Sequence, residues 1–305
     1  MAYTKIVAGC DLSTPSDAAL DRTIAIAELH AAKIILVHAQ ADDAPIADVD
    51  NAMLAQLGEV SAAVRAVEAR GLAERMATIQ ARGLAVEVVS RVGPPGEVLS
   101  AVAAERHAEL IVIGTHGHTG ITRFLLGSTA SSTIRHAGCD VLVCRGDGKT
   151  PFQRPLVATD FSPASAKALT RTSAVCAPGV TIHVIHAWQL PAGSWGASLL
   201  GQARFPWSTV RDAVLDSAKA QAAKLSAEHA ALGHPFHVEL VQGPPASVIT
   251  EAAERDGHDL IAVGAHGHRG VRRLLLGSVA ESTIRHSPCS VLVVHGGPEG
   301  APAAT

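Results

Sequence analysis

Glycine and serine recur at one fixed spacing in two places along the chain. The two motifs have the form Gly-x2-Gly-x9-Gly-Ser and consist of Gly114, Gly117, Gly127 and Ser128, and of Gly264, Gly267, Gly277 and Ser278. Each follows an apolar run typical of a buried strand and precedes a predicted helix. Glycine permits positive φ and lets a phosphate oxygen approach backbone N–H groups, and the start of a helix offers further N–H donors. The motif therefore indicates a phosphate site built mainly from the main chain.

A purely structural explanation of the motif stays open beside the functional one. The glycines could close tight turns, and the hydroxyls of Ser128 and Ser278 could cap a helix instead of binding phosphate. The recurrence does not decide between them, because a duplication copies turns as faithfully as sites. A Walker A motif, GxxxxGK[ST], is absent from the sequence, which excludes a P-loop nucleoside triphosphatase.

The chain repeats itself at an offset of 150 residues. Segments 111–143 and 261–293 carry the same residue at 21 of 33 positions. A repeat of this length is the size of a single domain and too long for a solenoid unit. We predict domains over residues 1–147 and 151–295, joined by a short linker that contains Gly and Pro, and a flexible tail over 296–305.

Each repeat is predicted to alternate strands and helices. The order is strand, helix, strand, long helix, strand, helix, strand, helix, strand, and the first five strands are expected near 4–10, 33–39, 84–91, 109–114 and 140–144. Continuous apolar runs and this alternation indicate an α/β fold with a parallel sheet covered on both faces. The first helix should begin after Ser13, and its counterpart after Ser162, because a hydroxyl followed closely by Pro is typical of a helix start.

An aspartate ends the first strand of each repeat. Ligands of open parallel sheets bind at the carboxyl ends of the strands, so Asp11 and Asp160 are candidates for ligand contact. The alternative is that each carboxylate stabilises the start of the next helix.

The glycine-serine motif, in this place and in both repeats, resembles the ATP-binding branch of the universal stress protein family. The resemblance covers nearly the whole chain. It implies two Rossmann-like, three-layer α/β sandwiches of the adenine nucleotide alpha hydrolase-like type, each with a five-stranded parallel sheet. It also implies ATP as the ligand, one per domain, with Mg²⁺ held through the phosphates.

The resemblance further implies which residues contact the nucleotide. Aspartate meets the nucleoside, the backbone after strand two reads the adenine edge, and the motif holds ribose and phosphates. In the first copy these residues are Asp11, Ala39, Gly114, Gly117, Gly127, Ser128 and Thr129, and in the second Asp160, Ala187, Gly264, Gly267, Gly277, Ser278 and Val279. The family often has Pro-Thr-Asp at the end of strand one, whereas this chain has Gly9-Cys10-Asp11 and Ala158-Thr159-Asp160.

Composition and charge restrict the classes of partner. A net charge of −3 gives no reason to expect nucleic-acid binding, and no apolar run is long enough for a membrane span or a signal peptide.

Five cysteines without a CxxC spacing fit a reducing cytoplasm, and Cys139 and Cys289 are expected to be small buried residues. The last strand of each repeat is an edge strand, and in the family such edges pair across a two-fold axis. The two halves of this chain can therefore pair internally as a pseudo-dimer, and whole chains can dimerise further into a homodimer of tandem chains.

Three functions remain open at this point. The first is a nucleotide-binding regulatory or stress-protective protein with little or no turnover, the second a slow ATPase or phosphotransferase, and the third an interaction module without nucleotide. The loop histidines His116, His118, His266 and His268 are interpreted as loop residues or phosphate contacts and not as a metal site. The apolar segment 188–207, which contains all three tryptophans, is either a lid, a partner surface or a loop folded on itself.

Overall fold

The structure is a computed structural model that describes residues 2–41, 51–115, 126–189, 207–265 and 276–295, with the backbone alone for 51–56 and 207. The chain divides into two compact units, Met1–Pro151 and Phe152–Thr305, called unit 1 and unit 2 below. Gly117, Gly267, the four loop histidines, Trp195 and the tail 296–305 lie outside the described residues.

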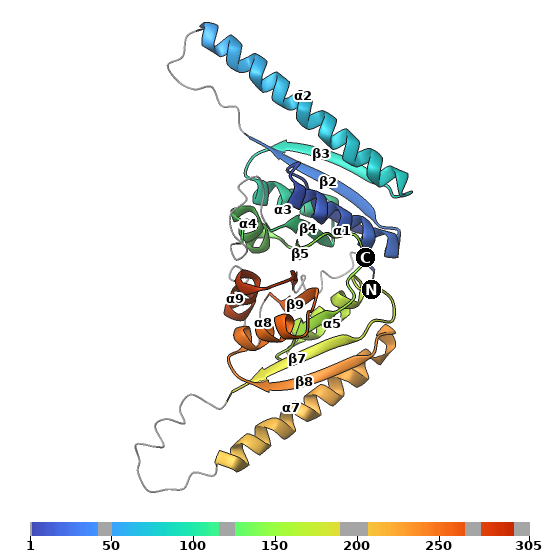
Figure 1. Cartoon of the computed structure of the whole chain (residues 1–305), viewed down its shortest axis with the longest axis vertical. Coiled ribbons are helices and arrows are strands. Elements are labelled where there is room, and N and C mark those ends of the chain that lie inside the picture. Colours follow the sequence, from blue (N-terminus) through green and yellow to red (C-terminus); the bar gives the residue numbers. More distant parts are fainter. Residues whose placement is uncertain (1, 42–50, 116–125, 190–206, 266–275, 296–305) are drawn as a thin grey trace, which may run out of the picture. The chain divides into compact units, whose positions relative to one another are not determined.

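The described residues of unit 1 form five strands and four helices in alternating order (Figure 1). They are β1 (Lys5–Gly9), α1 (Thr14–His30), β2 (Lys33–Gln40), α2 (Asn51–Ala81), β3 (Val86–Val92), α3 (Pro95–Arg106), β4 (Leu110–Gly114), α4 (Ser128–His136) and β5 (Asp140–Cys144).

Among the described residues, unit 2 repeats this order. Its elements are β6 (Pro155–Ala158), α5 (Pro163–Ser173), β7 (Ile182–Trp188), α7 (Trp207–His229), the 3-10 turn η1 (Ala230–Leu232), β8 (Phe236–Gln242), α8 (Pro245–Arg255), β9 (Leu260–Gly264), α9 (Ser278–His286) and β10 (Ser290–Val294).

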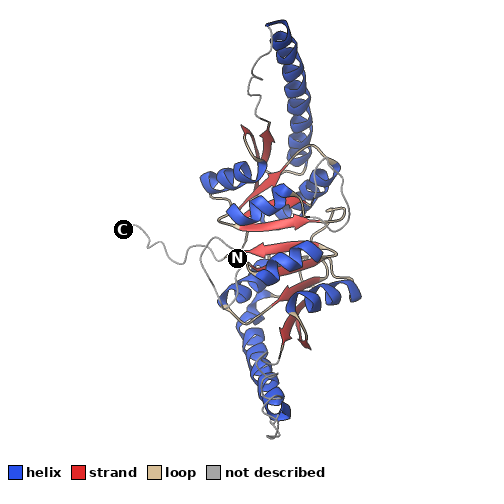
Figure 2. Ribbon diagram, turned by 90° about the vertical axis from the view of Figure 1, so that its left-hand side faces the viewer, coloured by secondary structure: helices blue, strands red, loops and turns tan. Residues whose placement is uncertain are grey.

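All strand pairs within each unit are parallel. The spatial order is β3-β2-β1-β4-β5 in unit 1 and β8-β7-β6-β9-β10 in unit 2, with the change of direction beside the first strand of each unit. Figure 2 shows helices on two sides of the strands in each unit. The predicted α/β fold with a parallel, Rossmann-like sheet is confirmed.

Burial and capping explain why these residues form these elements. The strands β4 and β5 are almost wholly buried, because helices cover both faces and their Val, Leu and Ile side chains form the core. The Oγ of Ser13 caps α1 by accepting from Ser16 N, and Ser162 caps α5 in the same way through Ser165 N. Both predicted helix starts are therefore confirmed.

The units differ where their second and third strands begin. In unit 1 the Glu87 carboxylate accepts hydrogen bonds from Lys33 Nζ at 2.6 Å and Arg106 Nε at 2.8 Å, and these bonds lower the pKa of Glu87. In unit 2 imidazoles gather there instead. The ring of His183 lies 5.4 Å from that of His237 and 4.9 Å from that of His258.

Acid is expected to destabilise unit 2 through His183. Burial lowers its pKa from the ordinary 6.5, and the charges of His258, His237 and Arg154 lower it further, against an opposing effect of Asp256. Below pH 6.5 the unfolded chain therefore binds more protons than the folded one, so stability is full above this pH and is lost as the pH falls. His183→Ile, which copies Ile35 of unit 1, should reduce this loss.

Tryptophan fluorescence provides the measurement, since all three tryptophans belong to unit 2. Denaturant midpoints at neutral and mildly acidic pH should differ less for His183→Ile than for the unsubstituted chain. Equal pH dependence in the two proteins would show that the imidazole cluster does not control acid stability.

Candidate functional site

Several separate stretches of unit 1 meet around one cavity of about 280 Å³. They include the ends of β1, β2 and β4, the first turn of α4 and residues of α1 and α3, whose chain positions are far apart. The predicted site residues that line the cavity are Asp11, Ala39, Gly114, Gly127, Ser128 and Thr129. The structure thus brings together every predicted site residue of unit 1 that it describes.

Backbone hydrogen bonds hold these strand ends in register. Cys10 N donates to Val37 O at 2.9 Å, and Gly127 N donates to Thr115 O at 3.0 Å, which joins the start of α4 to the end of β4. The same bonds occur in unit 2, from Thr159 N to Ile185 O at 2.9 Å and from Gly277 N to Ala265 O at 2.8 Å.

The start of α4 is open at the cavity. Gly127 is the N-cap residue and has no side chain to make a capping hydrogen bond. Ser128 is the first residue of the helix, and its side chain is exposed. The suggestion that Ser128 caps this helix is therefore wrong. It is also wrong for Ser278, because the N-cap residue of α9 is Gly277. The first N–H groups of an α-helix have no partner within the helix, so an anion can accept from them.

The glycines of the motif serve different purposes. Gly127 has φ −61° and Gly277 has φ −63°, which any residue can adopt, so neither position uses the positive φ that glycine permits. Gly114 is required by packing, because a Cβ there would lie 2.9 Å from Pro15 O in the first turn of α1. Close packing thus accounts for Gly114, whereas backbone conformation does not account for Gly127.

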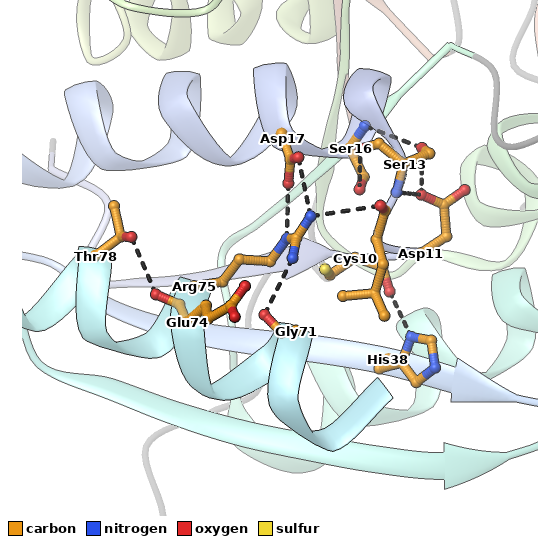
Figure 3. Close-up of polar contacts among 11 residues, drawn as sticks. Cys10, Asp11, Ser13, Ser16, Asp17, His38, Gly71, Glu74, Arg75 and Thr78 are labelled. Carbon is orange, nitrogen blue, oxygen red and sulfur yellow. Dashed lines mark hydrogen bonds and ion pairs between the residues drawn. The ribbon is translucent and has the colours of Figure 1, made fainter. Parts of the chain in front are cut away.

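Asp11 combines a structural role with a place on the cavity wall. Its Oδ1 accepts from Ser13 N at 3.0 Å and also from Ser13 Oγ, which shapes the turn between β1 and α1 (Figure 3). Asp160 Oδ1 accepts from Ser162 N at 3.0 Å in unit 2. The helix-start role considered for both aspartates is thereby observed, and for Asp11 it coexists with exposure to the cavity.

Sequence reasoning missed several residues of the cavity wall. The apolar members include Val37, Leu99 and Ile113, and burial raises the pKa of the Cys10 thiol beside them. Their residue types could not identify them as wall residues, because Val, Leu and Ile also form the core elsewhere in the chain. The position of Leu99 depends on how α3 packs against β1, where a Cβ on Gly9 would lie 3.3 Å from it.

The second-copy residues occupy the same positions in unit 2. Asp160 follows β6, Ala187 lies near the end of β7, Gly264 ends β9, and α9 begins after Gly277 with Ser278 and Val279. Gly267 lies outside the described residues, as Gly117 does in unit 1.

Two histidines near the site have structural roles. His38 Nδ1 lies 2.8 Å from Cys10 O, and His186 Nδ1 lies 2.8 Å from Thr159 O, so each imidazole bonds the end of the neighbouring strand. The part of the chain that the structure describes contains no group of three His, Cys, Asp or Glu residues able to hold a metal ion.

All five cysteines are described, and no disulfide joins them. Cys289 is buried as predicted, whereas Cys139 is half-buried, so that prediction is wrong. Trp188 is also buried, at the end of β7. No described helix is long and apolar enough to cross a bilayer.

Known proteins resemble the chain in both sequence and fold. A universal stress protein of Mycolicibacterium smegmatis is 26% identical over 310 aligned positions, which cover 95% of this chain and 96% of that protein. One of Methanocaldococcus jannaschii is 48% identical over 62 residues, which span 20% of this chain and only 36% of that protein. The crystal structure of a putative universal stress protein from Pseudomonas aeruginosa UCBPP-PA14 matches with a TM-score of 0.64 at 16% identity, covering 96% of this chain and 94% of that one.

The family profile matches the chain twice. It covers residues 2–145 and again residues 151–295, so each match contains one glycine-serine motif and one aspartate at the end of a first strand. At 16% identity the structural match supports the fold alone, whereas the two profile matches cover most of the chain. The chain therefore belongs to the universal stress protein family and carries two tandem copies of its domain.

Proposed function

We propose that each unit binds one molecule of ATP and that the protein acts as a nucleotide-dependent regulatory or stress-protective protein. The observation that carries the proposal is the meeting of Asp11, Ala39, Gly114 and the start of α4 around a single cavity. A crevice at the carboxyl ends of parallel strands, beside the change in strand order, is where such sheets bind ligands.

The chemistry of the cavity wall matches the parts of an adenine nucleotide. The apolar side chains of Val37, Leu99 and Ile113 offer a surface for the purine, and Asp11 offers a carboxylate to ribose hydroxyls. The open N–H groups at the start of α4 and the Ser128 hydroxyl offer donors to phosphate oxygens. These donors can hold phosphates without a lysine because charge-assisted hydrogen bonds contribute about 1.5–3 kcal/mol each.

Magnesium fits this site as a companion of the phosphates. Among the described residues of the cavity wall, Asp11 is the one carboxylate, and its Oδ1 already accepts from Ser13. Mg²⁺ keeps several waters and is commonly bound through substrate phosphates, so the proposed ion contacts the nucleotide and water.

Little or no turnover is proposed on the same grounds. The described wall residues that ionise are Cys10 and Asp11, and burial keeps the Cys10 thiol protonated by raising its pKa. Asp11 is held in the turn by Ser13 instead of being free to activate a water molecule. Steady phosphate release that Asp11→Ala or Asp160→Ala abolishes would instead favour a slow ATPase.

Identification of the bound ligand tests the proposal. Denaturation of gently purified protein should release an adenine nucleotide detectable by mass spectrometry, and Mg-ATP should raise the melting temperature by mass action. No released nucleotide together with no thermal shift would favour an interaction module.

Asp11→Asn separates the two roles of this side chain. Asparagine keeps an oxygen that accepts from Ser13 N but loses the charge, so stability should be retained while Mg-ATP affinity of unit 1 falls about threefold to tenfold. Asp11→Ala should lower both stability and affinity. Calorimetric titration and thermal unfolding check this, and unchanged affinity in both variants would limit Asp11 to its structural role.

The proposed setting is the cytoplasm, with a homodimer of tandem chains as the working form. Cysteines that form no disulfide fit a reducing compartment. Light scattering coupled to size-exclusion chromatography tests the dimer, and a mass of one 31.4 kDa chain would contradict it.

A further inference from the structure

The turn that carries Asp11 contains a residue in an unfavourable conformation. Leu12, between Asp11 and Ser13, has φ 64°, in the left-handed region that residues with a Cβ rarely adopt. Such a conformation persists where surrounding contacts hold it. The contacts around Leu12 therefore help to place Asp11 at the cavity.

Arg75 of α2 supplies such contacts to the turn. Its Nη2 donates to Leu12 O at 3.4 Å, while Nε and Nη2 donate to the two carboxylate oxygens of Asp17 at 2.7 and 2.9 Å (Figure 3). Its Nη1 donates to Gly71 O at 3.0 Å, one turn earlier in α2. One guanidinium thus joins α2, the turn and the first turn of α1, and its side chain is only 17% exposed.

The absence of a side chain at Gly71 brings α2 close to the same turn. A Cβ there would lie 3.1 Å from Leu12 Cδ2, which is tighter than ordinary contact. Helix α2 therefore contacts Leu12 at two points. Arg75 donates a hydrogen bond to its carbonyl oxygen, and the helix surface at Gly71 packs against its side chain.

Unit 2 holds its corresponding turn differently. Phe161, at φ 62°, packs its ring 4.5 Å from that of His186 on β7, and its N–H donates to Thr159 Oγ1 at 2.9 Å. Unit 1 has Cys10 in place of Thr159 and Leu12 in place of Phe161, so the Cys10 thiol takes the backbone hydrogen bond from Leu12 in place of the hydroxyl, and the ring contact is missing. Ala166 stands where unit 1 has Asp17, so unit 2 has no carboxylate for an equivalent pair.

We propose that Arg75 is a positioning residue for the nucleotide site of unit 1, and that α2 thereby controls this site while α7 does not control the site of unit 2. The inference rests on the proposed nucleotide binding. Arg75 acts through Leu12 and Asp17 and not through contact with the ligand. Movement of α2 away from the turn would release Leu12 and, with it, Asp11.

Arg75→Met tests the proposal in a chain whose second site is closed by Gly277→Val. Calorimetric titration with Mg-ATP should show about threefold to tenfold weaker binding than the parent, the range that corresponds to the net contribution of about one ordinary hydrogen bond. Arg75→Lys should recover part of the loss. Arg65→Met is the matched control, because Arg65 lies on the same helix and its Nη2 donates to Ser61 within that helix.

The reciprocal background separates positioning from general destabilisation. With unit 1 closed by Gly127→Val, Arg75→Met should leave the Mg-ATP affinity of unit 2 unchanged. If Arg75→Met lowers the melting temperature too far for titration, Asp17→Asn replaces it, since this change removes the charge partner of Arg75 and keeps the side-chain shape. Weaker binding confined to unit 1 supports the proposal.

Unit 1 affinity that stays unchanged in Arg75→Met, or in Asp17→Asn where that variant is used, overturns the positioning role while leaving the proposed function intact. Equal weakening in both backgrounds overturns it too, because the effect would not be specific to unit 1. Absence of Mg-ATP binding by the unsubstituted chain would overturn the proposed function and the inference together, and the two failures are thereby distinguishable.

Discussion

Gly127→Val is expected to abolish Mg-ATP binding by unit 1, so that the chain binds one nucleotide instead of two. The residue lines the cavity at the N-cap of α4, where phosphate oxygens would approach the backbone. Valine adds a branched side chain at that point and blocks the approach to the first N–H groups of the helix. Calorimetric stoichiometry measures the loss, and Gly277→Val should produce the same result for unit 2.

The fold should survive both substitutions. At φ −61° and −63° neither position needs glycine for its backbone, and replacing an N-cap glycine with valine costs about 1 kcal/mol of stability. Melting temperatures lowered by only about 2–4 °C therefore serve as the control. Two nucleotides bound with parental affinity by either folded variant would remove α4 or α9 from the site.

Gly114→Ala, in contrast to Gly127→Val, should strongly lower the stability of unit 1. The added methyl group would lie 2.9 Å from Pro15 O and 3.1 Å from Pro15 C, and backbone atoms yield less readily than the end of a side chain. Overpacking of this kind costs about 1–3 kcal/mol. Denaturant unfolding followed by circular dichroism measures the loss, with tryptophan fluorescence of unit 2 as an internal reference.

Gly58→Ala is the matched control for that substitution. Gly58 lies within α2 with no atom within 4 Å of an added Cβ, so alanine should stabilise the helix by about 0.5–1 kcal/mol. If Gly114→Ala is as stable as the unsubstituted chain, α1 can move away from β4, and the close packing at Pro15 is not what requires glycine.

Much of the fold follows from local sequence patterns. Apolar runs placed the strands within about two residues, and Ser13 and Ser162 marked helix starts, because burial on both faces and capping leave local signals. Because the sequence repeats, each element predicted in the first copy was also predicted in the second. Residues at the ends of β1, β2 and β4 could be predicted to meet, since parallel strands bring their carboxyl ends to one edge.

Other features depend on packing that no local pattern encodes. The ion pair of Arg75 with Asp17 joins residues 58 positions apart, and it depends on how α2 is rotated against α1. The need for glycine at 114 comes from Pro15, about a hundred residues earlier, and not from backbone conformation. The sequence alone could not distinguish a capping role from a ligand-binding role for Ser128, because that distinction depends on Gly127 being the N-cap residue.

A crystal structure of the chain grown with excess Mg-ATP tests the central claim most directly. We predict triphosphate density against the first turn of α4 and of α9, with the purine beside Val37 in unit 1. Solvent alone at both helix starts, in crystals soaked to saturation, would contradict nucleotide binding by this protein.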